Sequence, residues 1–151
     1  MLRIQVSHSY FLRYDRKQWE RGKPYPPLAT LQVASLLWDL GHEVSLFDAM
    51  LADGVEDYAG SLTAASPDVV VIYEDNFNYL TKMCLNRMRE AACQMIAEAR
   101  AHGARVIVAG SDASDFAAGV RRRLWRDLHG VPFNPTKVRG EFLHLGTTRQ
   151  F

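Results

Sequence analysis

The chain has 151 residues, of which 48% are hydrophobic and 23% charged, and its formal net charge is +1. These values are those of one soluble globular domain that can bury a core. The chain contains no run of 18 apolar residues and enters a strand pattern directly after Met1, so we expect no membrane span, no signal peptide and a cytoplasmic location.

The charge is unevenly distributed along the chain. Residues 1–112 contain 11 Lys/Arg and 14 Asp/Glu, whereas residues 113–151 contain 7 and 3. This break predicts an α/β domain over residues 1–115 and an atypical basic tail over residues 116–151, such as a truncated or frame-shifted gene would also produce. The arginine-rich stretch at 121–126 is more typical of a solvated helix end than of a nucleic-acid patch, so we do not expect a nucleic-acid partner.

The first part of the chain predicts a strand, a long loop, a helix and a second strand. Leu2–Val6 alternates between apolar and polar residues as a short strand does, and residues 9–27 are predicted to be a loop of the length that is usually functional or disordered. Pro27 can start a helix that Gly41 ends. Its expected apolar stripe is Leu28, Leu31, Ala34, Leu37 and Trp38. Glu43–Phe47 follows as a strand near an edge.

The next part continues the alternation. Asp53 or a neighbour is expected to cap a helix with the stripe Val55, Tyr58, Ala59, Leu62 and Ala65. Val69–Tyr73 is apolar at every position, which indicates a central parallel strand covered on both faces. Asn76 or Asn78 can cap a long helix that Gly103 ends. Its expected buried face is Leu80, Cys84, Met88, Ala91, Met95 and Ala99.

Arg105–Ala109 is predicted to be a further internal strand, because it is also almost wholly apolar. The βαβαβαβ alternation predicts the α/β class, with a doubly wound parallel sheet of the flavodoxin-like or Rossmann-like kind. The first, third and fourth strands should lie inside the sheet and the second outside, which predicts the strand order 2-1-3-4, with right-handed crossovers.

No self-sufficient active site is evident in these residues. Cys84 and Cys93 are nine residues apart in one predicted helix, on opposite faces, so they can neither pair nor share a metal and are read as buried thiols. The five histidines are scattered, and neither a Gly-x-Ser-x-Gly elbow nor a P-loop is present. We therefore predict no catalytic residues and no protein metal ligands, and binding is favoured over catalysis.

The ends of the predicted strands carry the candidate binding residues. In an open α/β sheet, ligands bind outside the carboxyl ends of the strands, and Val69–Tyr73 runs directly into the polar residues 74–76. The alternative is that these residues form a solvated loop. Asp48 stands where an acid contacts the ribose of a nicotinamide cofactor, but the turn Ser7–Tyr10 lacks the glycines that such a site needs. We therefore interpret Asp48 as a turn or cap residue.

Several short motifs, taken in order, resemble one family. They are Pro24-Tyr25-Pro26-Pro27-Leu28-Ala29, Leu40-Gly41-His42-Glu43-Val44, Asp48-Ala49, Pro67-Asp68-Val69-Val70 and Ala109-Gly110-Ser111-Asp112. Through them, residues 1 to about 115 resemble the N-terminal cobalamin-binding domain of radical S-adenosylmethionine enzymes.

The resemblance implies a corrinoid lying flat on the carboxyl edge of the sheet. The implied cofactor-binding residues are Ser7, His8, Tyr73, Glu74, Asp75, Asn76, Gly110, Ser111 and Asp112. The loop Asp-x-His-x-x-Gly, whose histidine ligates cobalt in methylmalonyl mutase-type domains, is missing, which implies cobalamin without a protein histidine ligand. His8 fits either a structural role at the strand end or a ligand contact.

The chain departs from that family because it lacks the three-cysteine loop of the iron–sulfur cluster. The resemblance therefore implies a cobalamin module with no iron–sulfur cluster of its own, whose radical catalytic domain acts in trans or belongs to the parent gene. Two alternatives stay open: a flavodoxin-like interaction domain without a cofactor, and a small enzyme that acts on a nucleotide or phosphate at the same edge.

Overall fold

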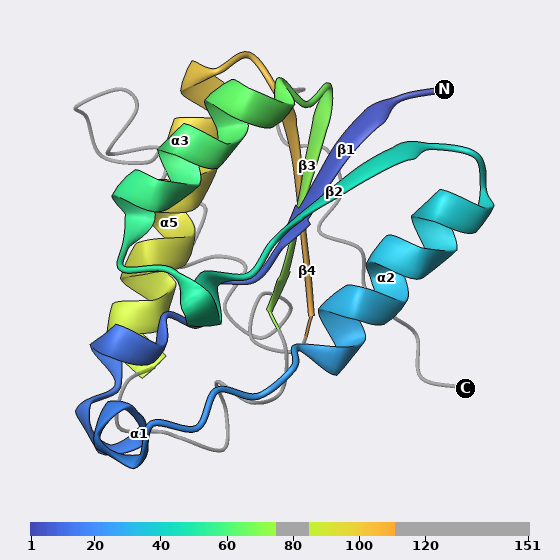
Figure 1. Cartoon of the computed structure of the whole chain (residues 1–151). Helices are drawn as coiled ribbons and strands as arrows, with labels where there is room; N and C mark the ends of the chain where they lie inside the picture. Colours follow the sequence, from blue (N-terminus) through green and yellow to red (C-terminus); the bar gives the residue numbers. More distant parts are fainter. Residues whose placement is uncertain (75–84, 111–151) are drawn as a thin grey trace, which may run out of the picture.

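The computed structural model describes residues 1–74 and 85–110 and contains a parallel sheet of four strands in the order β2-β1-β3-β4 (Figure 1). The strands are β1 (Arg3–Ser7), β2 (Glu43–Phe47), β3 (Val69–Glu74) and β4 (Arg105–Gly110). The predicted α/β class, the parallel sheet and the strand order are confirmed.

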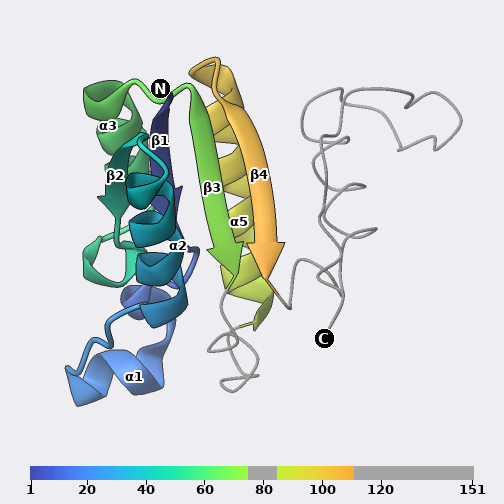
Figure 2. The ribbon, with the colours of Figure 1, turned by 90° about the vertical axis from the view of Figure 1, so that its right-hand side faces the viewer.

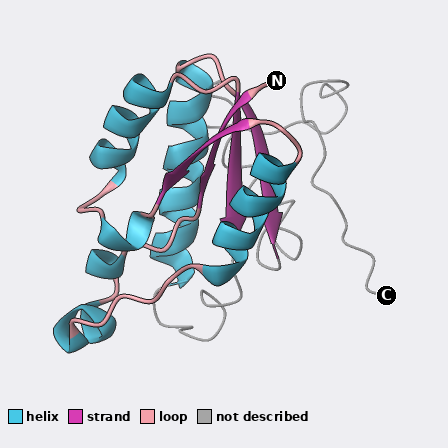
Figure 3. Cartoon of the chain, turned by 45° about the vertical axis from the view of Figure 1, so that its right-hand side comes forward, coloured by secondary structure: helices cyan, strands magenta, loops and turns pink. Residues whose placement is uncertain are grey.

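Helices cover the two faces of the sheet unequally. Helix α2 (Leu28–Asp39) lies over β1 and β2 on one face, and α3 (Val55–Ala65) and α5 (Leu85–Ala101) lie on the other (Figure 2). This arrangement on both faces is that of a doubly wound fold, and it is also visible in Figure 3. No helix in the described parts of the chain is long and apolar enough to cross a membrane.

The main core lies between the sheet and the helix pair α3 and α5. Its strand residues Val70 and Ile72 are fully buried, as the apolar run in β3 predicts. The predicted stripe of α3 is buried at Val55, Tyr58 and Leu62. In α5 the predicted positions Met88, Ala91, Met95 and Ala99 are buried, and Cys93 is a buried free thiol.

The stripe predicted for α2 is wrong in part. Val33, Ala34 and Leu37 pack against the strands, whereas Leu28 and Trp38 are 64% and 65% exposed. The helix is apolar nearly all round, so periodicity could not decide which side faces the sheet. Pro27 and Gly41 do lie at the two ends of this helix, as predicted.

The segment predicted as a long loop contains two short helical elements, η1 (Leu12–Tyr14) and α1 (Arg16–Arg21). The carboxylate of Asp15 accepts a hydrogen bond from the backbone N–H of Gln18 and so caps α1. Gly22, with φ of 60°, ends it. The cap of α3, expected at Asp53 or a neighbour, is Gly54.

The last described strand, β4, pairs on one side only, with β3. The expectation that it lies inside the sheet is therefore not met within the described residues, and Ile107 is 41% exposed. The basic tail at 116–151 and the helix caps proposed at Asn76 and Asn78 lie outside the described residues.

Candidate functional site at the carboxyl edge

The candidate site lies where β1 and β3 run side by side. The chain leaves β1 to cross to β2 on one side, and β3 continues to β4 on the other, so the strand order changes direction between β1 and β3. Such a switch point is where doubly wound folds bind ligands, outside the carboxyl ends of the strands. The residues that follow β1 and end β3 therefore form the candidate site.

His8 is the first residue after β1, and the structure fixes both of its ring nitrogens. Nε2 lies 2.9 Å from Oδ1 of Asp48, and Nδ1 accepts a hydrogen bond of 3.2 Å from the backbone N–H of Tyr10. Because Nδ1 is an acceptor, the proton of the neutral ring is on Nε2, and the Nε2–H group donates a hydrogen bond to Asp48. The side chain is 3% exposed, so His8 here joins the ends of β1 and β2.

Asp48 is a cap residue, as predicted, and its contact with His8 also places it at the candidate site. Its Oδ1 also accepts a hydrogen bond of 3.0 Å from the backbone N–H of Met50, which begins the short helix η2 (Ala49–Leu51). Its position at the end of β2 was the available signal, because carboxyl ends of neighbouring parallel strands meet at one edge.

A second buried polar contact joins β1 to β3. The hydroxyl of Ser9 donates a hydrogen bond of 2.7 Å to Oε2 of Glu74, and both side chains are buried. This contact lies directly at the switch point, and Ser9 was not among the predicted residues. It draws the loop after β1 over the end of β3.

Ser7 is fully buried under α3, beside the side chain of Tyr58. Burial raises the pKa of the Tyr58 phenol well above its ordinary value, and the Ser7 hydroxyl partly offsets this. Gln5, two residues earlier on the same face, donates a hydrogen bond of 3.0 Å to Ser61 of α3. Ser7 therefore contributes to the interior of the fold.

Among the predicted site residues that the structure describes, Tyr73 and Gly110 retain partial exposure. They lie on neighbouring strands, because Tyr73 pairs with Ala109 and Glu74 with Gly110. Gly110 has φ of 115°, and a Cβ atom there would overlap the backbone of Glu74. The close approach of β4 to β3 thus requires a glycine at this position. The structure therefore explains Gly110 without a ligand that passes over it.

The structure therefore brings five of the predicted residues to one edge, where Ser7, His8 and Glu74 are buried and Tyr73 and Gly110 are partly exposed. The remaining predicted residues, Asp75, Asn76, Ser111 and Asp112, lie outside the described residues. Within the described ranges, no group of three or more His, Cys, Asp or Glu side chains could hold a metal ion.

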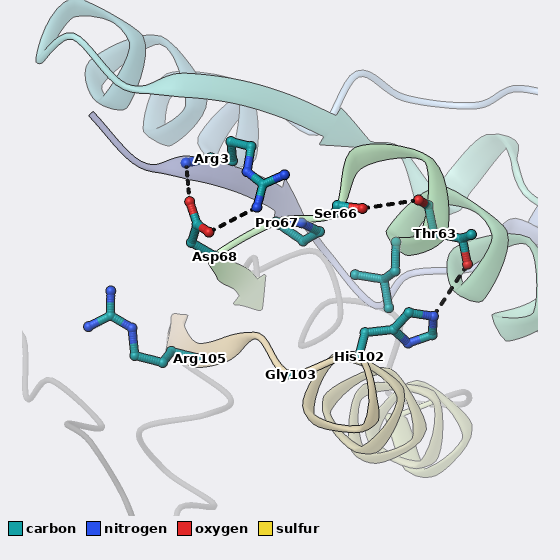
Figure 4. Close-up of a pocket in the computed structure, with 9 residues that line it drawn as sticks. Arg3, Thr63, Ser66, Pro67, Asp68, His102, Gly103 and Arg105 are labelled. Carbon is teal, nitrogen blue, oxygen red and sulfur yellow. Dashed lines mark hydrogen bonds and ion pairs between the residues drawn. The ribbon is translucent and has the colours of Figure 1, made fainter.

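A cavity of about 660 Å³ lies at the opposite, amino edge of the sheet (Figure 4). Arg3 and Asp68 form an ion pair of 3.1 Å at its wall, and His102 lies 3.3 Å from the hydroxyl of Thr63. The cavity also adjoins the C-terminal ends of α3 and α5, whose carbonyl groups disfavour an anion. It is therefore distinct from the predicted site and lacks a clear charge preference.

Fold and edge together define a doubly wound α/β domain with a polar switch point. Comparisons with protein-family models, with curated proteins and with solved structures found no match.

Proposed function

We propose that this chain is a cobalamin-binding module whose corrinoid lies over the carboxyl edge of the sheet. The observation that carries the proposal is the polar switch point between β1 and β3, where the resemblance in sequence also implies the site. When bound, a corrinoid supplies methyl-transfer chemistry to a radical catalytic domain, which would act in trans or belong to the parent gene.

Two of the described residues can contact this cofactor, and three others hold the edge in place. Tyr73 and Gly110 offer a partly exposed edge for the ring or its amide side chains. His8 is held by Asp48 and by the backbone N–H of Tyr10, which supports binding without a cobalt–histidine bond. Ser7, His8 and Glu74 support the edge from beneath, because their side chains are at most 3% exposed.

The test is a titration of the purified full chain with hydroxocobalamin, followed by its visible absorption spectrum. We expect saturable binding that Tyr73→Ala weakens. The matched control is Arg105→Ala, an exposed residue at the other end of β4, which should leave the affinity unchanged. Circular dichroism of both variants verifies that the fold is retained.

Two results would overturn the proposal. The first is a wild-type chain that shows no saturable spectral change with hydroxocobalamin. The second is equal affinity in the wild type and in a folded Tyr73→Ala variant, which would place any bound corrinoid away from this edge.

The second candidate function is an interaction domain without a cofactor. It is favoured by the burial of Ser7, His8 and Glu74, which bond within the protein, and by the exposed apolar side chains of α2. Absence of corrinoid binding together with a stable protein partner would select it.

A further inference from the structure

The largest group of exposed apolar side chains in the described residues lies on α2 and next to it. The helix has four such residues, a fifth directly follows it and a sixth lies on β2: Leu28, Leu31, Leu36, Trp38, Leu40 and Leu46. The other exposed large hydrophobic residues lie elsewhere in the described residues: Met1, Trp19, Tyr25, Leu51 and Ile107. On the opposite face, neither α3 nor the part of α5 from Asn86 onwards has an exposed large hydrophobic residue. A group of exposed apolar side chains on the helix that covers one face, with none found on the helices that cover the other, indicates an interaction site.

The helical winding divides these residues into two flanks. α2 is right-handed and runs antiparallel to the strands, with Val33 and Leu37 packed on the sheet (Figure 2). At about 100° per residue, Leu31 and Trp38 then point towards the β2 side, whereas Leu36 points towards the β3 side. We call Leu31, Trp38 and Leu46 the β2-side patch.

The strand β2 lies at the end of the described sheet and pairs only with β1. Its five residues, EVSLF, contain one charge and no proline, and Leu46 is 42% exposed. Sheet edges in monomeric proteins are usually protected by lysine, proline or a bulge, but β2 contains neither lysine nor proline and its pairing with β1 is continuous. A second strand can therefore add to this edge.

We propose that the β2 edge and the β2-side patch form a two-fold interface with a second copy of this chain. Antiparallel pairing of β2 with its partner, centred on Ser45, is self-complementary, as an isologous interface requires. Val44 of one protomer then lies opposite Leu46 of the other, on the face that α2 covers. Leu31 and Trp38 extend the apolar contact above the strands.

The distribution of charge at this interface is compatible with a second copy of the chain as the partner. Residues 28–38 contain no charged side chain. In the antiparallel register the two copies of Glu43 are about 14 Å apart, because about 3.4 Å separates successive residues of a strand. The contact therefore brings no like charges together at its centre. Residues 111–151 continue from β4, at the other end of the described sheet.

The first test measures the mass of the full chain by analytical ultracentrifugation over a range of concentrations. We expect the wild type to form a dimer, and Trp38→Glu to weaken dimerisation by at least tenfold. Leu36→Glu is the matched control, because Leu36 is on the same helix and is similarly exposed, 60% against 65% for Trp38, but lies on the other flank. It should leave the dimer intact.

The second test determines the strand register. Ser45→Cys places two thiols opposite each other across the two-fold axis, where antiparallel partners have Cα atoms about 4.5–5.5 Å apart, a distance that a disulfide can span. Mild oxidation should cross-link Ser45→Cys efficiently and Glu43→Cys poorly. The wild type, with its own Cys84 and Cys93, reports background cross-linking.

A wild-type chain that stays monomeric at every concentration would overturn the proposal, and another partner or residues 111–151 would then account for the patch. Equal weakening by Trp38→Glu and Leu36→Glu, with both variants folded by circular dichroism, would also overturn it. So would equal cross-linking of the two cysteine variants. Corrinoid binding is measured separately, so its absence leaves these results unaffected.

Discussion

Two hydrogen bonds, one buried and one partly buried, hold the residues after β1 in place, and each involves a side chain that the sequence analysis had assigned to a ligand, His8 or Glu74. Asp48 accepts from His8 and from the backbone of Met50, and Glu74 accepts from Ser9. The residue types at this edge were predictable, because polar residues follow strands at a binding edge. Their exposure was not predictable, because it depends on how the loop after β1 folds over the edge.

The role of Asp48 can be measured by substitution. Asp48→Ala should lower the free energy of unfolding by about 1–3 kcal/mol, because it leaves the buried Nε2 of His8 without its acceptor. Asp48→Asn retains an oxygen acceptor and should cost less. Urea denaturation measures both. A loss for Asp48→Ala below about 0.5 kcal/mol, the range of ordinary surface substitutions, would contradict this role.

The ion pair at the amino edge predicts a dependence of stability on pH. Hydrogen bonds from the side chain and backbone of Arg3 hold the pKa of Asp68 below its ordinary value of 3.8. Because the folded pKa is depressed, the stabilisation is present above the unfolded pKa and is lost as the pH falls through the folded pKa.

We therefore expect Asp68→Asn to make the loss of stability below about pH 4 less steep. The effect should be small and should shrink in high salt, because both side chains are substantially exposed. Urea denaturation between neutral and acidic pH measures it, with Asp39→Asn on α2 as the control. An unchanged acid limb in Asp68→Asn would show that the pair contributes nothing measurable.

At the scale of elements, the strands and the long helices followed from the sequence, and the short elements did not. The apolar run at Val69–Tyr73 is typical of a central strand that is covered on both faces. The apolar stripe that includes Met88 and Met95 indicates a single buried helix face. In contrast, α1 has six residues and no buried side chain, so its short sequence contains no periodic signal. The orientation of α2 was not predictable, because the helix is apolar nearly all round and its periodicity does not identify the side that faces the sheet.

The junction of β3 with β4 depends on a glycine. Gly110→Ala should destabilise the fold strongly, because φ of 115° disfavours a side chain and the new Cβ would overlap the backbone of Glu74. Gly103→Ala is the matched control, because Gly103 has φ of 82° but open space around it, so only conformational strain of about 1 kcal/mol is expected. Equal losses in thermal denaturation would contradict the overlap. Because this substitution disturbs the sheet, it cannot report on a ligand.

At the scale of the whole molecule, the two faces of the sheet differ. The face under α3 and α5 is covered by a helix pair with a continuous buried core, whereas the face under α2 leaves leucine and tryptophan side chains exposed. The carboxyl edge lies between these faces. A domain with a candidate ligand edge and one apolar side is suited to act together with another protein surface, which is consistent with both candidate functions.

The last prediction concerns the catalytic activity of the chain in the absence of another protein. After anaerobic reconstitution with iron and sulfide, we expect no cleavage of S-adenosylmethionine to 5′-deoxyadenosine. The family that the chain resembles holds its cluster with three cysteines in one short loop, whereas this chain has only Cys84 and Cys93, and Cys93 is buried. Liquid chromatography detects the product, and a complete radical enzyme, reconstituted in parallel, serves as the positive control. Formation of 5′-deoxyadenosine above the level without protein would show that the chain assembles a cluster by another set of ligands.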